Sequence, residues 1–195
     1  EKGEHDEAEM LLRDALTIQR KLSDEVNWGI ISKLGTLGRW NYIKGNYEEA
    51  EKFFQEYLSN YIEDQKKSFS FISDSTLSYI ITRRVKSIAA FLEERDDYDR
   101  AEKYYREAVE INRELLGEKN MRTILAEIDL GNVLIKLRRF DEAESLLIDS
   151  YKYMRGRLKT QSVNMRKAIE SLVSLYETWN KPDKAEEYRA LLDKE

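Results

Sequence analysis

One short motif recurs along the chain at nearly constant spacing. It reads GNYEEAEKFF at residues 45–54, RDDYDRAEKYY at 95–105 and RRFDEAESLL at 138–147. A period of about 40 residues is typical of stacked helical pairs, each of which buries an apolar face against the next pair. Aligned on their alanine, the copies are separated by 42, 51, 42 and 42 residues, at Ala8, Ala50, Ala101, Ala143 and Ala185.

The residues between the motifs predict helices throughout. The chain has one proline and eight glycines in 195 residues, so few positions interrupt a helix, and good helix formers dominate the rest. Large apolar side chains follow each alanine at helical spacing, as Phe54 and Tyr57 do. A polar turn before each alanine offers an aspartate or asparagine as a helix cap, and Pro182 is expected at the first position of the last helix. The sequence therefore predicts an all-α protein.

The helix before each motif is predicted to cross the next helix closely. A small residue stands twelve positions before three of the alanines, at Gly38, Ala89 and Gly131. We expect each of these to lie against the motif alanine, small residue against small residue.

Composition excludes several classes of function. Lys and Arg number 33 against 38 Asp and Glu, and the net charge of −5 argues against a general nucleic-acid-binding protein. The absence of cysteine excludes disulfides and thiolate metal sites and fits a cytoplasmic protein. No apolar run approaches the roughly 18 residues that span a bilayer, so no membrane association is expected. The first residue is Glu, which we interpret as a fragment of a longer protein.

The small residue, turn and Ala-x-x-x-aromatic pattern resembles the tetratricopeptide repeat (TPR). The 42-residue spacing and the stretch AVEINRELLGEKN at 108–120 resemble the longer repeats of kinesin light chains and of bacterial proteins with the same variant. The resemblance implies a right-handed superhelical solenoid of antiparallel helix pairs. Asn41 and Leu134 replace the tyrosine usual in the family, so these copies have diverged.

The repeats divide the chain into one helical domain, residues 1–195. A leading half repeat is expected at 1–22, followed by full repeats at about 27–63, 75–117, 121–158 and 162–195. The nine extra residues of the 51-residue spacing are placed in 64–76, as longer helices together with a loop. We expect an apolar stripe on the first helix, Met10, Leu11, Ala15 and Ile18, to cover the next repeat on one side only. Because this helix has no partner before it, apolar surface should remain exposed at the N-terminal end, and we expect weak self-association or a frayed first helix.

The resemblance also implies a concave groove lined by the first helix of each pair. Family ligand positions lie six and three residues before the small residue and one and four after it. We expect an acidic-hydrophobic peptide or protein segment there, with Asn132 bonding its backbone. The alternative is that Leu125, Ile128 and Ile135 are core residues and that the basic residues of the groove only form a solvated face. The predicted groove residues are Arg39, Tyr42, Arg83, Lys86, Ile128, Asn132, Ile135 and Lys167.

No residue pattern predicts catalysis, a cofactor or a metal. The only histidine, His5, is expected in the turn before Ala8 rather than at a metal or catalytic site. The leading hypothesis is a non-catalytic scaffold that binds a protein or peptide. The alternatives are a structural spacer or oligomerisation array and, with less support from the net charge, an RNA-binding helical repeat.

Overall fold

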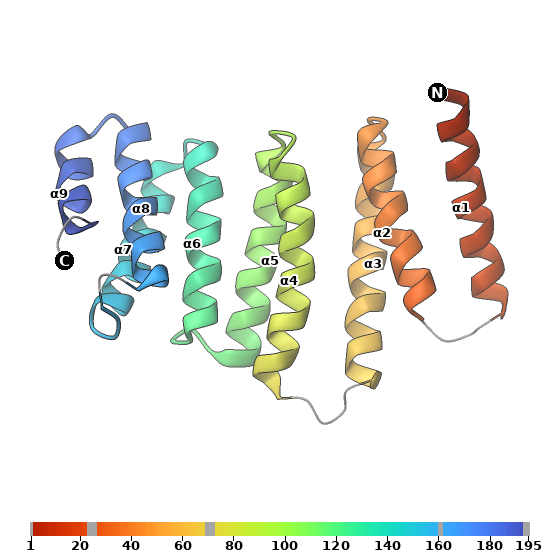
Figure 1. Ribbon diagram of the computed structural model, residues 1–195, viewed down its shortest axis with the longest axis horizontal. Helices are drawn as coiled ribbons and strands as arrows, with labels where there is room; N and C mark the ends of the chain where they lie inside the picture. The colour runs from red at the N-terminus through yellow and green to blue at the C-terminus, as the bar shows by residue number, and fades with distance from the viewer. Residues whose placement is uncertain (1, 23–26, 69–72, 160–161, 193–195) are drawn as a thin grey trace. The chain divides into compact units, whose positions relative to one another are not determined.

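The computed structural model describes residues 2–22, 27–68, 73–159 and 162–192. These residues form nine α-helices and no strand, so the predicted all-α class is confirmed (Figure 1). The chain divides into two compact units, residues 1–73 (unit 1) and 74–195 (unit 2), and each is described by itself.

Unit 1 contains three helices, of which the middle one packs against both others. These are α1 (Lys2–Leu22), α2 (Trp28–Ile43) and α3 (Tyr47–Ser68). Helix α2 contributes Ile31, Leu34 and Leu37 to the core, and all three are fully buried. Apolar faces on both sides of α2 therefore fix this three-helix layer.

Helix α1 differs from the expectation in two respects. It begins at Lys2, so His5 lies within the helix and not in a turn; acidic residues such as Glu7 near its start favour the helical state. The residue that packs is Leu16, which is buried, whereas Met10, Leu11 and Ile18 are each more than half exposed. The expected apolar stripe thus faces away from α2.

Unit 2 contains six helices in three successive pairs. Helix α8 packs against α6 as well as against its neighbours in sequence. The core is built from both members of each pair, with Tyr104, Leu134, Leu147 and Leu172 fully buried. The helices are α4 (Asp74–Glu93), α5 (Tyr98–Leu116), α6 (Met121–Lys136), α7 (Phe140–Arg155), α8 (Val163–Thr178) and α9 (Pro182–Leu192).

The motif alanines occupy the crossings as expected, but what faces them differs. Ala50, Ala101, Ala143 and Ala185 are at most 1% exposed. A Cβ added at Gly131 would lie 2.8 Å from side-chain atoms of Leu147, one turn beyond Ala143. Glycine therefore makes room for the large residue that follows the alanine, and the small-against-small interpretation is corrected.

The same turn joins the two helices of every pair. A residue two or three positions after the end of the first helix has a φ of 58° or 83°. The backbone of the turn bonds back to the helix in a Schellman pattern, for example Arg139 N to Leu134 O at 3.0 Å. Glycine fits this left-handed region without steric cost, whereas Arg138 does not. The four turn residues are Gly45, Asp96, Arg138 and Asn180.

Helix caps follow the expectation in part. Asp97 caps α5 through the backbone N–H of Arg100, and α9 begins at Pro182. Helix α7 instead starts after Arg139 with no side-chain cap, because Asp141 already lies inside its first turn. First helices have caps that the motif did not reveal, from Asn27, Asn120 and Ser162.

The stretch 64–76 is helical at both ends. Helix α3 has 22 residues and α4 has 20, against 16 for α2, α6, α7 and α8. The expected lengthening of two helices is confirmed, and residues 69–72 lie outside the described residues.

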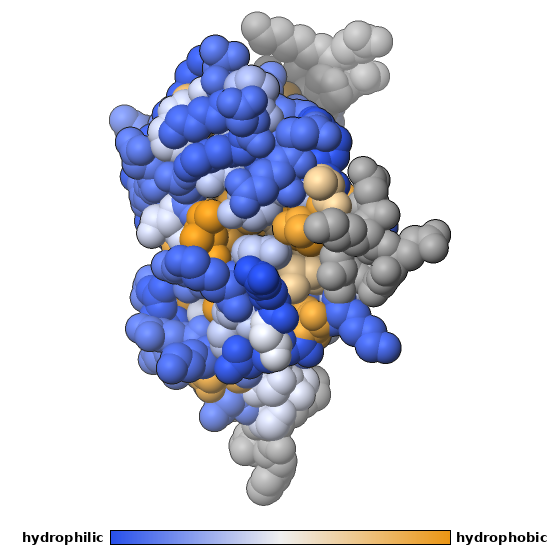
Figure 2. Space-filling view, turned by 90° about the vertical axis from the view of Figure 1, so that its left-hand side faces the viewer, coloured by the Kyte–Doolittle hydropathy of each residue, from blue (hydrophilic) through white to orange (hydrophobic). Residues whose placement is uncertain are grey.

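The α9 end of unit 2 has a mainly hydrophilic surface. Figure 2 shows mostly hydrophilic residues on this side, with hydrophobic ones visible mainly in a band between them. Helix α9 exposes Asp183, Lys184, Glu186 and Glu187 to solvent. This polar face contrasts with the exposed apolar residues of α1.

Candidate partner-binding site

The predicted groove residues of unit 1 lie on α2. Arg39 is exposed, whereas Tyr42 is buried and packs against Tyr47 with ring centroids 5.0 Å apart. These two residues are described apart from the other six, which belong to unit 2.

The four predicted residues on α6 and α8 have different environments. Ile128 and Ile135 are buried in the core, and Asn132 is half-buried. Lys167 of α8 is partly exposed and forms an ion pair with Asp129 of α6.

Arg83 and Lys86 line a pocket of about 350 Å³ between α4 and α6, which we call the α4–α6 slot. No Cα of α4 lies within 8 Å of a Cα of α6 in the described residues, whereas α6 and α8 approach more closely than this. Long side chains therefore bridge the space that the two backbones leave open. The residues that line the slot are Tyr79, Thr82, Arg83, Lys86, Asn112, Arg122, Leu125 and Ala126.

Two contacts join α4 to α6 across the slot. The Arg122 guanidinium carbon lies 4.9 Å from the centroid of the Tyr79 ring, a cation–π contact. About two helical turns further along both helices, Lys86 forms an ion pair with Asp129. Since Arg83 falls between Tyr79 and Lys86 on the same face of α4, it lies between these two contacts.

Asn112 of α5 joins both helices. It is 3% exposed, accepts a hydrogen bond from the Ser78 hydroxyl, and donates through Nδ2 to the Arg122 carbonyl at 3.3 Å. Because a buried amide is costly without partners, these bonds favour one spacing of α4 and α6.

The basic side chains around the slot differ in their partners. Asp129, whose side chain is 12% exposed, pairs with both Lys86 and Lys167. Arg83 and Arg122 form no ion pair with any described residue, and no acid lines the slot. Coulomb attraction to an incoming anion is strongest where no carboxylate already neutralises the base. The two arginines are therefore the bases best placed for a ligand.

Other acids near α4 and α6 are engaged elsewhere. Glu93 accepts from the Tyr105 hydroxyl at 2.7 Å, and burial together with this bond raises the pKa of Tyr105. Glu127 pairs with Arg113 at 3.2 Å, and burial raises the pKa of its carboxyl. Neither of these carboxylates therefore neutralises Arg83 or Arg122, and Lys86 is the one base of the slot that has a carboxylate partner among the described residues.

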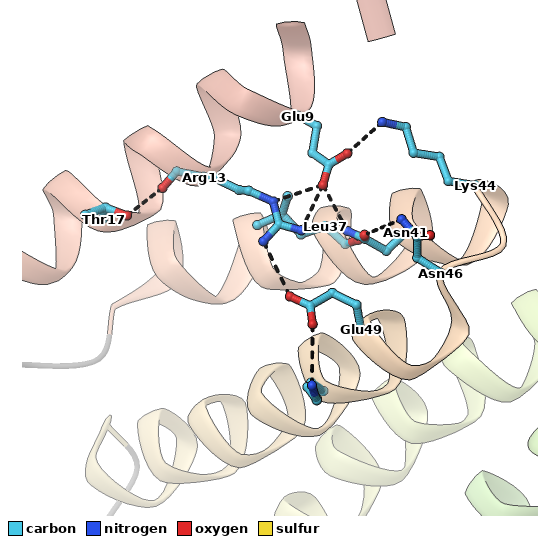
Figure 3. A network of polar contacts seen from close by, with 9 residues as sticks. Glu9, Arg13, Thr17, Leu37, Asn41, Lys44, Asn46 and Glu49 are labelled. Carbon is cyan, nitrogen blue, oxygen red and sulfur yellow. Dashed lines mark hydrogen bonds and ion pairs between the residues drawn. The ribbon is translucent and has the colours of Figure 1, made fainter. Parts of the chain in front are cut away.

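A second set of polar contacts ties each second helix to the repeat that follows it. In unit 1 the Glu9 carboxylate accepts from Arg13, from Asn41 and from Lys44, the last at 2.7 Å (Figure 3). The bond from Lys44 lowers the pKa of Glu9. Glu49 on α3 in turn lies 3.5 Å from Arg13.

The same tie recurs in unit 2 with the same spacing. Arg106, five residues after its motif alanine as Arg13 is, pairs with Glu142, and Arg139 pairs with Glu102 at 2.7 Å. The glutamate after the next alanine, Glu144, accepts from Lys184 at 2.9 Å and from Tyr176 at 2.7 Å. Each glutamate that directly follows a motif alanine in these three copies thus holds the next repeat.

Sequence reasoning missed several residues of the site, four of which make contacts between the helices around the slot. Tyr79 and Arg122 lie one turn before the family positions that defined the groove, and continuing the stripe at helical spacing would have found them. Asp129 and Lys86 are opposite charges on the first helices of neighbouring repeats, and a comparison of the aligned repeats could have suggested that they pair. Asn112 gives no such signal, because it lies on a second helix.

The fold and the slot define a helical-repeat protein with a ligand-sized opening between two first helices. The model of the tetratricopeptide repeat family matches residues 1–63 and 82–156, and the chain belongs to this family. Tetratricopeptide repeats generally mediate protein–protein interactions and are generally non-catalytic. No curated protein matches the sequence.

Solved structures share the fold at low sequence identity. A Podosopora anserina protein described as a kinesin light chain with nearly identical TPR-like repeats is 16% identical, with a TM-score of 0.63 over 98% of this chain and 86% of that one. BtubC (BKLC) from P. vanneervenii is 19% identical, with a TM-score of 0.56 over 97% of this chain and 74% of that one. The expected likeness to kinesin-light-chain repeats is confirmed.

Neither a membrane-spanning helix nor a metal site is present in the residues that the structure describes. None of their helices is long and apolar enough to cross a membrane. They contain no group of three or more His, Cys, Asp or Glu side chains that could hold a metal ion.

Proposed function

We propose that this chain is a non-catalytic scaffold that binds an acidic-hydrophobic segment of a partner protein at the α4–α6 slot. One observation carries the proposal: the slot is lined by three bases and no acid, beside the apolar Leu125 and the ring of Tyr79. The bases attract carboxylates, and the apolar wall accepts a hydrophobic side chain. Arg83 and Lys86 remain from the groove expected on the sequence, and Arg122 and Tyr79 join them.

The other groove residues have lesser roles in this proposal. Asn132 and Lys167 flank the slot on the α8 side, and Ile128 and Ile135 support it from the core. Arg39 and Tyr42 are proposed as a separate contact in unit 1. We keep the division into one repeat domain with four full repeats, a bacterial origin and a cytoplasmic location as parts of the same proposal.

The test is selection of binders from a random peptide library displayed on phage, followed by affinity measurement on purified protein. Selected peptides should be rich in acidic and hydrophobic residues, and their affinity should fall as salt rises. Arg83→Glu and Arg122→Glu should each abolish binding with the helical circular dichroism unchanged.

Arg157→Glu is the matched control. This arginine also covers a tyrosine ring, with its guanidinium carbon 4.0 Å from the Tyr153 centroid, and lies outside the slot. Failure to select any peptide would favour the spacer alternative. Salt-dependent binding of single-stranded RNA that requires the same arginines would favour the RNA-binding alternative.

We also propose weak self-association through α1. Met10, Leu11, Ile18 and Leu22 are 56–80% exposed, which leaves apolar area that a second copy can cover. Sedimentation at several protein concentrations tests this, with Leu11→Glu combined with Ile18→Glu expected to give a monomer at every concentration. A parent that is already monomeric throughout would refute it.

A further inference from the structure

Two arginine side chains, Arg83 and Arg122, line the α4–α6 slot from its two sides. Arg122 reaches the ring of Tyr79, with its guanidinium carbon 4.9 Å from the centroid, and Arg83 is one helical turn from Tyr79 on the same face of α4. Side chains separated by four residues on a helix are neighbours, about 5–6 Å apart at Cβ. The Arg122 guanidinium is therefore brought to the part of the slot from which Arg83 projects.

The charge around this point exceeds what one carboxylate can neutralise. Lys86 and Lys167 share the single carboxylate of Asp129, while Arg83 and Arg122 have no acidic partner in the part of the chain that the structure describes. Arg122 is also in the first turn of α6, where the helix dipole adds positive potential. A compact dianion fits this field better than one monoanionic side chain does.

Guanidinium groups are also suited to a tetrahedral oxyanion. Each presents paired N–H donors that match two oxygens of a phosphoryl group, and a phosphorylated side chain carries about −1.5 to −2 charges near neutral pH. Tyr79 and Leu125 provide an apolar wall for the carbon chain or ring that bears the phosphate.

We propose that the α4–α6 slot recognises a phosphoryl group on a side chain of the bound partner segment, held between Arg83 and Arg122. This inference rests on the proposed function and adds a dependence on phosphorylation. Binding would then be switched by a kinase and a phosphatase that act on the partner.

The first experiment uses small probes on isotope-labelled protein. Phenyl phosphate should shift the NMR signals of the Arg83 and Arg122 side-chain N–H groups at lower concentration than benzoate, and inorganic phosphate should shift them more weakly than phenyl phosphate. Equal response to benzoate and phenyl phosphate would overturn the preference for a phosphoryl group. A response to inorganic phosphate equal to that of phenyl phosphate would overturn a side-chain ligand.

The second experiment compares degenerate peptide libraries with a fixed central phosphoserine, phosphotyrosine, serine or glutamate. A phosphorylated library should bind roughly tenfold or more tightly than the glutamate library, and Arg83→Gln or Arg122→Gln should remove that difference. Arg157→Gln should leave it intact. Affinity for the phosphorylated library should also rise as pH passes the second phosphate pKa, about 6, with no such rise for glutamate.

The outcomes separate the two proposals. Slot-dependent binding of glutamate and phosphorylated libraries with equal affinity would overturn the phosphoryl inference and leave the partner-binding function standing. Phenyl phosphate binding at the arginines without binding of any peptide library would overturn the partner-binding function instead.

Discussion

Lys86 on α4 and Asp129 on α6 form an ion pair although no Cα of one helix lies within 8 Å of a Cα of the other. The same carboxylate also pairs with Lys167 on α8. One side chain thus connects the first helices of three successive pairs and occupies two of the bases that an acidic ligand would otherwise meet.

Asp129→Asn should have two opposite effects. Losing the charge should lower the free energy of unfolding by about 1 kcal/mol, since the lysines are partly exposed and screened by solvent. It should also tighten binding of acidic peptides, because Lys86 and Lys167 lose their competing partner. Denaturant unfolding and peptide titration measure the two effects. Asp149→Asn, at an exposed pair with Lys152, should change neither, and an unchanged affinity for Asp129→Asn would contradict this role.

The tie between successive second helices can be tested by a charge swap. Arg106→Glu should destabilise unit 2 by about 0.5–1 kcal/mol, because the new carboxylate would lie beside those of Glu102 and Glu142 and the three would repel one another. Arg106→Glu combined with Glu142→Arg should recover part of that loss. Thermal denaturation of the double-mutant cycle gives the coupling energy, and a value of zero would mean that the pair contributes no stability.

Arg138 is a site where a single substitution should stabilise the protein. It has φ of 58°, the left-handed region that costs most side chains about 1–2 kcal/mol. Arg138→Gly should raise the melting temperature, because part of that cost disappears even after the added entropy of glycine in the unfolded chain. Asn180→Gly should give a smaller gain, since asparagine tolerates this conformation. A lower melting temperature for Arg138→Gly would contradict the turn geometry.

The repeat ties predict a loss of stability in acid. Bonds from Lys44, Arg106 and Lys184 lower the pKa values of Glu9, Glu142 and Glu144 below the usual 4.5. The folded state therefore binds fewer protons than the unfolded state, and this stabilisation is fully present above the unfolded pKa and lost as pH falls through the folded values. Urea unfolding from pH 6 to pH 3 should show an unfolding midpoint that falls as the pH falls. The fall should be less steep in Glu9→Gln, and an equally steep fall in that variant would mean that Glu9 contributes nothing.

Ala143→Arg should destabilise the protein strongly. Ala143 is fully buried, so the substitution forces a long charged side chain into the crossing of α6 and α7 and should cost on the order of 3 kcal/mol or more. Ala190→Arg on the exposed face of α9 is the control and should leave the melting temperature nearly unchanged. Equal melting temperatures for the two variants would place the crossing elsewhere.

The helical architecture was predictable because it depends on local pattern and spacing. The burial of the motif alanines and the start of α9 at Pro182 follow from residues close together in sequence. The hydrogen bonds of Glu9 were not predicted, because their donors, Asn41 and Lys44, lie more than 30 positions further along the chain. Its signal was nevertheless present, as a glutamate directly after every motif alanine.

The site was predictable only in outline. Arg83 and Lys86 follow from the family register, whereas the contact of Arg122 with Tyr79 depends on the distance between two helices that share no short-range sequence pattern. Periodicity also cannot distinguish a ligand-facing isoleucine from a core one, and Ile128 and Ile135 proved to be core. The role of Asn112 could not be predicted without knowing how α5 packs beside α4 and α6.

Because α4 and α6 leave an opening between them, the residues that hold the fold are different from the residues that line the opening. Residues such as Ile124 and Val133 are buried and keep the helix pairs folded, while Tyr79 and Arg122 line the opening and are not part of that core. Mutations at such lining residues can therefore accumulate without unfolding the array. Duplicated copies of such a gene could diverge in the partners they select while retaining one and the same scaffold.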